Sequence, residues 1–240
     1  MKKRTGALAL AFALAVGSIS MAADLTLSDG HVLPLDSTIT VHDGSRSYLA
    51  PEFEKSLEQP ELRKNLAERI RTLGLFPDRD TAHEEMMADQ LIRLLKEGKV
   101  YQLRSERPEA MYQMVSVSAR MGREDLARWV EIVNAIHRAH PEKINSVPSV
   151  PEPRDILEAQ YKSTGAQNGR FVKGKTVCGT SYVAGGVYAA PQNEGMTFPL
   201  YAFVLETADD DHMGLTVFLT DQVTGKVFEP ILKKGAEGLK

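Results

Sequence analysis

Four β-prone runs decide the expected fold: FVKGKTVC (171–178), YVAGGVY (182–188), FPLYAFVL (198–205) and LTVFLT (215–220). Valine, tyrosine, phenylalanine and threonine dominate them, and turn-like residues such as Asp209–Asp211 separate them. A fifth run, KVFEPIL (226–232), follows the turn-like residues QVTG (222–225). The spacing of the five runs predicts a C-terminal β-rich domain over residues 154–240, built as an antiparallel sheet or small barrel.

A proline-rich stretch, PEKINSVPSVPEP (141–153), precedes this domain and holds four of the twelve prolines. Proline removes a backbone donor and is excluded from helix interiors and central strands. The stretch therefore predicts a stiff linker between two domains, with a short amphipathic segment, Arg154–Lys162, after it.

The segment before the linker, residues 51–140, is predicted to be a helical domain. Apolar residues recur at helical spacing within Leu62–Leu73, Met87–Leu95, Met111–Met121 and Leu126–Ile136. The expected boundary signals are Pro60 and Gly74 for the first helix, a Thr81–Glu84 capping box and Gly98 for the second, Arg107–Pro108 and Gly122 for the third, and Pro141 for the fourth.

The stretch ARMGREDLA (119–127) and Pro141 carry a resemblance to a known repeat family. With them, Glu109–His140 resembles one helix-turn-helix unit of a tetratricopeptide-like α-solenoid. No second copy of this signature lies upstream in the sequence, and stable arrays need about three units. The segment is therefore interpreted as an ordinary helical hairpin, with a repeat remnant as the alternative.

Residues 24–50 alternate apolar and polar positions around two Asp-Gly pairs, Asp29–Gly30 and Asp43–Gly44. This pattern predicts short strands joined by hairpin turns. Two or three strands are marginally stable alone, so they must pack against a later part of the chain. The expected fold class is therefore α+β: an N-terminal β-hairpin segment, a helical domain, a linker and an antiparallel β domain.

Residues 1–23 have the three parts of a secretory signal peptide. Lys2, Lys3 and Arg4 precede an apolar run of twelve, GALALAFALAVG (6–17), and small residues follow in SISMAA (18–23). The run is too short to span a bilayer, and no lipid-modifiable cysteine follows it. We expect cleavage after Ala22 or Ala23 and a soluble periplasmic product that does not stay inserted in a membrane.

The charge and cysteine content limit the possible partners. Without the leader the chain has 26 basic and 32 acidic residues, a net charge of −6. A mildly acidic chain is a poor ligand for nucleic acid or anionic membranes. Its single cysteine, Cys178, cannot form an intramolecular disulfide, so the stability must come from the core.

Cys178 and His212 form the strongest catalytic candidate, because a thiolate nucleophile needs a histidine as base. The competing interpretation, which we prefer, is a Cys178 buried in a strand of the β core, since free cysteine is among the most buried residue types. Trp129 is a candidate binding residue, because tryptophan is a frequent interface anchor; capping the core is its alternative role.

Other motifs have simpler explanations. GRFVKGKT (169–176) satisfies the phosphate-loop pattern, but a β-prone run follows it where a helix is required, and Lys173–Gly174 is expected to form a hairpin turn. His137 and His140 have the spacing of metal ligands without a third ligand. We therefore expect no cofactor and no metal.

These observations favour a non-enzymatic exported protein, a partner-binding or envelope-maintenance module with a protein partner in the cell envelope. The alternative is an envelope hydrolase that uses Cys178 and His212. The first hypothesis is preferred because the sequence contains no convergent set of catalytic residues.

Overall fold

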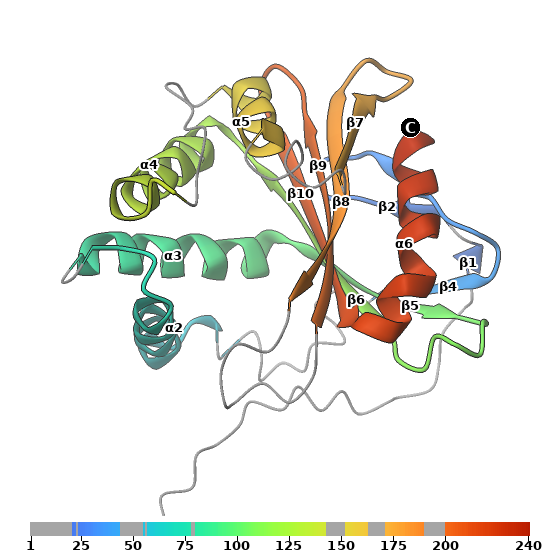
Figure 1. The fold of residues 1–240 in the computed structure, drawn as a ribbon, viewed down its shortest axis with the longest axis horizontal. Coiled ribbons are helices and arrows are strands. Elements are labelled where there is room, and N and C mark those ends of the chain that lie inside the picture. The colour runs from blue at the N-terminus through green and yellow to red at the C-terminus, as the bar shows by residue number, and fades with distance from the viewer. Residues whose placement is uncertain are drawn as a thin grey trace, which may run out of the picture.

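The computed structural model describes residues 21–22, 24–43, 55, 57–77, 80–142, 152–162, 171–189 and 200–240. Its centre is an antiparallel eight-stranded sheet, to which a two-stranded sheet is added (Figure 1). Along the large sheet the strands are β1 (Met21–Ala22), β4 (Ile39–Asp43), β5 (Lys99–Ser105), β6 (Met114–Met121), β10 (Met213–Asp221), β9 (Leu200–Ala208), β8 (Ser181–Ala189) and β7 (Phe171–Lys175). The small sheet pairs β2 (Asp24–Thr26) with β3 (Val32–Pro34).

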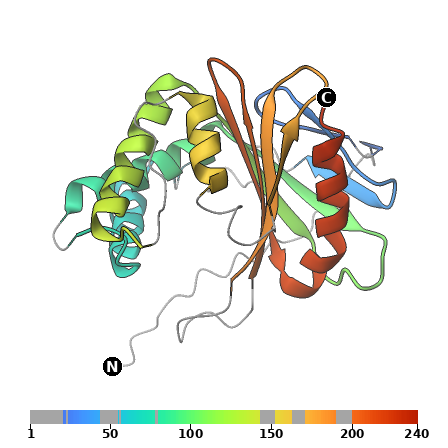
Figure 2. The same ribbon diagram turned by 45° about the horizontal axis from the view of Figure 1, so that its top comes forward.

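The helices lie on both sides of the large sheet (Figures 1 and 2). They are α2 (Pro60–Thr72), α3 (Thr81–Glu97), α4 (Arg123–Ala139), α5 (Pro153–Gln160) and α6 (Gln222–Glu237). One side carries α6 and the β2–β3 hairpin, and the other carries α2 to α5. The predicted α+β class with antiparallel sheets is confirmed.

The main core lies between the sheet and α6. Four large side chains at its centre, Tyr201, Phe203, Phe218 and Phe228, are fully buried. Two smaller apolar clusters follow on the opposite side, one between the sheet and α4–α5 and one among α2, α3 and α4. The helices of that side therefore pack on one another as well as on the sheet.

The N-terminal prediction is confirmed for the Asp29–Gly30 turn and the short strands; the predicted Asp43–Gly44 turn lies partly outside the described residues. The Asp29–Gly30 turn joins β2 to β3. Gly30 has a φ of 94°, a backbone conformation that glycine adopts readily because it has no Cβ atom. Leu25 and Leu33 are fully buried in the main core. The hairpin also exchanges two backbone hydrogen bonds with the chain end, between Val32 and Lys240.

Three of the four predicted helices are confirmed as α2, α3 and α4. One detail of α3 is wrong: Asp80, and not Thr81, is the N-cap residue, and its carboxylate accepts the backbone N–H of His83. Gly74, past the end of α2, has φ 59° as the predicted stop signal requires. The amphipathic segment after the linker is the helix α5.

The predicted helix over 107–121 is wrong, because Met114–Met121 is the strand β6. Its residues alternate between faces, with Ser116 and Ser118 buried on the α6 side. Gly122 does not end a helix; it is the N-cap of α4. A strand therefore stands where the tetratricopeptide-like resemblance requires a helix, and that resemblance does not hold in the structure.

The predicted strand over 226–232 and turn over 222–225 are also wrong, because both belong to α6. The carboxylate of Asp221 accepts the backbone N–H groups of Val223 and Thr224 and starts this helix. The other C-terminal strands are present as β7 to β10, and Asp209–Asp211 lies in the β9–β10 turn as predicted.

One sheet contains strands from both sides of the proline-rich stretch. β6, from the segment expected to be helical, pairs with β10 through seven residue pairs, from Met213–Met121 to Leu219–Val115. Residues 1–20 of the expected leader and residues 143–151 of the expected linker lie outside the described residues.

Candidate functional site

Cys178 lies in the turn between β7 and β8 and is exposed, so the prediction of a buried cysteine is wrong. β7 ends at Lys175, and a tight turn follows in which Thr176 N–H donates to Thr180 O at 2.8 Å. Gly179 completes it with φ 86°, and Val177 is 88% exposed. The turn holds Cys178 outside the packed sheet.

The predicted hairpin turn at Lys173–Gly174 is also wrong, because both residues lie inside β7. Gly174 is required there because a Cβ atom would stand 2.7 Å from the hydroxyl of Tyr182. A turn and the strand β8 follow β7, so the phosphate-loop pattern lacks its helix.

His212 lies in the β9–β10 turn, next to the β6–α4 connection. Its Nδ1 is 3.8 Å from Asp209 Oδ1, and it borders a shallow hollow with Arg120 and Asp125. Ser181 pairs with Ala208, so the β7–β8 and β9–β10 turns lie at the same end of the sheet, and their tips lean apart in Figures 1 and 2. Among the described contacts, none joins Cys178 to His212, so the structure brings no nucleophile–base pair together here.

Trp129 lies on α4 and is partly buried. It packs against two apolar clusters, one shared with the sheet and α5 and one shared with α2 and α3. Its indole Nε1 is buried, with no hydrogen-bond partner among the described residues. These contacts fit the packing role of Trp129 better than the role of interface anchor.

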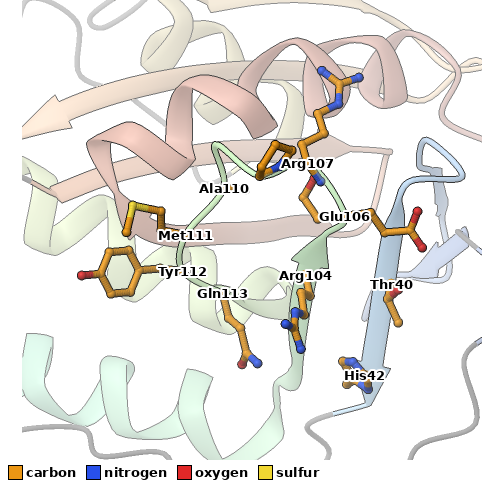
Figure 3. Close-up of a pocket in the computed structure, with 11 residues that line it drawn as sticks. Thr40, His42, Arg104, Glu106, Arg107, Ala110, Met111, Tyr112 and Gln113 are labelled. Atoms are coloured by element: carbon orange, nitrogen blue, oxygen red, sulfur yellow. The ribbon is translucent and has the colours of Figure 1, made fainter.

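A pocket of about 670 Å³ opens at the β4–β5 side of the sheet (Figure 3). This volume lies within the usual range of ligand sites. Two strands and the loop that follows β5 supply its lining: Thr40 and His42 from β4, Arg104 and Ser105 from β5, and Glu106, Arg107, Pro108, Ala110, Met111, Tyr112 and Gln113 from the loop.

Strand register puts the polar lining residues on one face. Thr40 pairs with Arg104. His42 lies two residues after Thr40 in β4, so the side chains of all three residues share one face of the sheet. Figure 3 shows Arg104 between Gln113 and His42, with all three side chains directed to the same side. The neighbouring positions Ile39 and Leu103 point to the opposite face and are buried in the main core.

The loop over residues 106–113 is held at both ends. The backbone N–H of Arg107 donates to Ser105 Oγ at 3.2 Å, and that of Tyr112 donates to Thr224 Oγ1 in α6 at 3.3 Å. Met111 and Tyr112 nevertheless expose 76% and 62% of their surface. The loop thus presents two large apolar side chains at the rim of the pocket.

The charges of the pocket are not balanced at Arg104. Among the described residues, its guanidinium makes no ion pair, whereas Arg107 points away from it and lies 4.0 Å from Asp36. The pKa of Asp36 is held below its usual value, chiefly because the Thr38 N–H donates to its carboxylate. Asp36 therefore stays ionised opposite Arg107.

His42 adds a second polar group to the same wall. Its Nδ1 is buried, with no hydrogen-bond partner in the described part of the chain. A guanidinium beside an imidazole, an amide and a hydroxyl can hold a carboxylate or another planar anion. Besides these donors the lining contains the carboxylate of Glu106, and among the lining residues no nucleophile is held by a base.

The sequence analysis did not predict this pocket, because it placed a third helix over residues 107–121 and no strand between that helix and the second one. The structure has β5 and β6 in this region. The available signal was the alternation in KVYQLRS (99–105), which puts Gln102 and Arg104 on one face of a strand. Joining that strand to Thr40 and His42 requires the β4–β5 pairing, which local pattern does not give.

The described residues contain no group of three or more histidine, cysteine, aspartate or glutamate side chains arranged to hold a metal ion. His140 Nε2, considered above as a metal ligand, lies 2.6 Å from the carbonyl oxygen of Gly74. Among the described helices, none has the length and apolar character needed to cross a membrane.

Comparison with protein-family models, with curated proteins and with solved structures finds no match for this chain. The pocket and its lining residues are therefore the basis of the function proposed below.

Proposed function

We propose that this chain is an exported, soluble periplasmic protein that binds a protein partner in the cell envelope and has no catalytic role of its own. The binding site is the pocket around Arg104, and the group it takes is an anion, a carboxylate of the partner. The observation that carries the proposal is the Arg104 guanidinium, which forms no ion pair with any described residue, in the same pocket wall as the buried Nδ1 of His42.

The chemistry of the site supports binding. Arg104 is exposed in the free protein, where an ion pair contributes at most about 1 kcal/mol; a partner that covers it and excludes water raises this to about 1.5–3 kcal/mol. Exposed Tyr112 and Met111 at the rim are of the residue types enriched at interfaces. The rival proposal of a Cys178–His212 hydrolase has no comparable support, because the two residues lie in separate turns.

Site-specific photo-crosslinking in cells tests the proposed surface. A photoreactive residue at Tyr112, on the pocket rim, is expected to trap a discrete partner, whereas the same residue at exposed Val177 traps none. Arg104→Gln should abolish the cross-link, and the matched change Arg128→Gln on the exposed side of α4 should keep it. Equal cross-linking from both positions, or a cross-link that survives Arg104→Gln, would contradict the proposed site.

Export is tested separately. The intact mass of the protein from the periplasmic fraction is expected to correspond to a chain that begins at Ala23 or Asp24. Recovery of only full-length chain in the membrane fraction would contradict the proposed localisation.

A further inference from the structure

β4 supplies Thr40 and His42 to the pocket, and its outer edge, the one that faces away from β5, is nearly unpaired within the described ranges. On its inner side β4 pairs with β5 through five residues, from Ile39–Ser105 to Asp43–Tyr101. On its outer side the described residues that pair with it are the two of β1, Met21 with Val41 and Ala22 with Thr40. The edge accepts a strand, and the strand that occupies it is very short.

The two residues of β1 are the ones that processing is expected to remove. Cleavage after Ala22 or Ala23 takes away the whole of β1, and no other strand in the described part of the chain pairs with the outer edge of β4. An open edge presents unpaired N–H and C=O groups and is a template for an added strand. We propose that an extended acidic segment of the partner protein adds to β4 in the mature chain; this rests on the export and the anion site proposed above.

Backbone direction shows which groups of β4 would take part. The N–H of Glu106 donates to Thr38 O at 2.9 Å, so the main chain of Thr38 faces β5. Main-chain groups alternate along a strand, so Thr40 and His42 face β5 as well, and the N–H and C=O of Val41 face outward. Val41 is therefore the centre of the new ladder.

The same register sets the side-chain preference of the segment. A residue opposite Thr40 or His42 shares a face with them and with Arg104. It stands two strand spacings, roughly 10 Å, from Arg104, within the joint reach of an arginine and an acidic side chain. The next residue falls on the face of buried Ile39, which favours an apolar side chain. The segment thus alternates acidic and apolar residues.

The opposite edge of the sheet does not offer this surface. There β7 carries Lys173 and Lys175, and lysines on an edge strand oppose further pairing. Lys173 Nζ also lies 3.3 Å from the Glu158 carboxylate of α5. β4, with the sequence ITVHD, carries no lysine.

The test uses the mature protein purified after export and a labelled peptide of about eight residues, the usual strand length, that alternates valine and aspartate. We expect binding that protects the Val41 amide from hydrogen exchange. A peptide that alternates valine and lysine is the matched control and should not bind. Arg104→Gln should weaken binding of the acidic peptide about 10-fold, and Arg128→Gln should leave it unchanged.

Blocking the outer edge of β4 gives a second test, which changes no residue of the mature chain. A chain that begins at Ser18 keeps β1 and should bind the acidic peptide more weakly than the mature chain. Binding that requires Arg104 but leaves the Val41 amide unprotected would overturn strand addition and leave the anion site intact. No binding of the acidic peptide, or equal binding of both peptides, would overturn the strand-addition proposal. Loss of the Tyr112 cross-link preference would instead overturn the proposed function.

Discussion

Glu206 is a carboxyl group enclosed between β9 and α5. With its amide turned to donate, Gln160 of α5 places its side-chain nitrogen 2.7 Å from both Glu206 oxygens. Burial raises the pKa of Glu206 to about 8, because the ionised form loses its hydration. The folded protein therefore holds a proton that the unfolded chain releases near pH 4.3.

This proton makes stability depend on pH. Between about pH 4.5 and 8 the folded state binds more protons than the unfolded state, so the free energy of unfolding falls as pH rises. Glu206→Gln removes the free-energy cost of burying an ionisable carboxyl group and keeps a hydrogen bond to Gln160. The Gln160 amide already offsets part of that cost by donating to the carboxylate, so the variant should be more stable by roughly 1–3 kcal/mol at pH 7. Urea unfolding across this range checks the prediction, with Glu158→Gln on half-exposed Glu158 as control. An unchanged pH slope in Glu206→Gln would contradict the assignment.

Cys178 gives a second prediction for a single residue. Because its side chain is exposed in a turn, iodoacetamide should label the folded protein as fast as the unfolded chain. Cys178→Ser should change the free energy of unfolding by less than about 0.5 kcal/mol. A thiol that reacts only in denaturant would mean that the turn packs differently.

At the scale of elements, the contact between α6 and β9 depends on a glycine. A Cβ atom at Gly225 would overlap the ring of Tyr201, which is fully buried. Gly225→Ala gains about 1 kcal/mol of helix propensity but forces the helix away from the sheet. We expect a net destabilisation of about 1–3 kcal/mol, measured by thermal unfolding. Gly122→Ala, where a Cβ atom meets nothing within 4 Å, is the control and should cost less. Equal losses in the two variants would show that this close contact is unimportant.

The same glycine explains why α6 could not be predicted from sequence. Gly225 and Pro230 are poor helix formers, and Val227 and Ile231 favour strands, so local preference indicates a turn and a strand. Packing of Phe228 and Leu232 into the main core, together with the Asp221 cap, outweighs that preference. Strands β8 to β10 were predictable because alternation and local preference agree there.

The error over 107–121 has a different cause. Met111, Met114 and Met121 recur at helical spacing, but Val115 and Val117 alternate with buried serines in β6. Strand period was the correct signal. Because β6 was predicted as a helix, the candidate site could not be predicted either: Arg104 and Gln113 become neighbours only when β5 and β6 pair.

At the scale of the whole molecule, the order of strands decides how the chain folds. β6 and β10 are adjacent central strands, although the proline-rich stretch lies between them in sequence. The N-terminal hairpin packs against α6 and pairs with Lys240 at the other end of the chain. Contacts so distant in sequence bind the two predicted domains into one sheet and one main core.

We therefore expect that residues 24–140 and 154–240 do not fold as separate fragments. Each fragment would expose a central strand, β6 or β10, along a seven-residue edge that is paired in the intact protein. Circular dichroism should show no cooperative thermal transition for either fragment alone, and mixing the two should restore one. The control is the intact mature chain nicked by protease between Ile144 and Val150, whose two pieces should remain associated on size exclusion. A cooperative transition in 154–240 alone would show that the C-terminal strands and α6 fold without β6, and the chain would then consist of two folding units joined along the sheet.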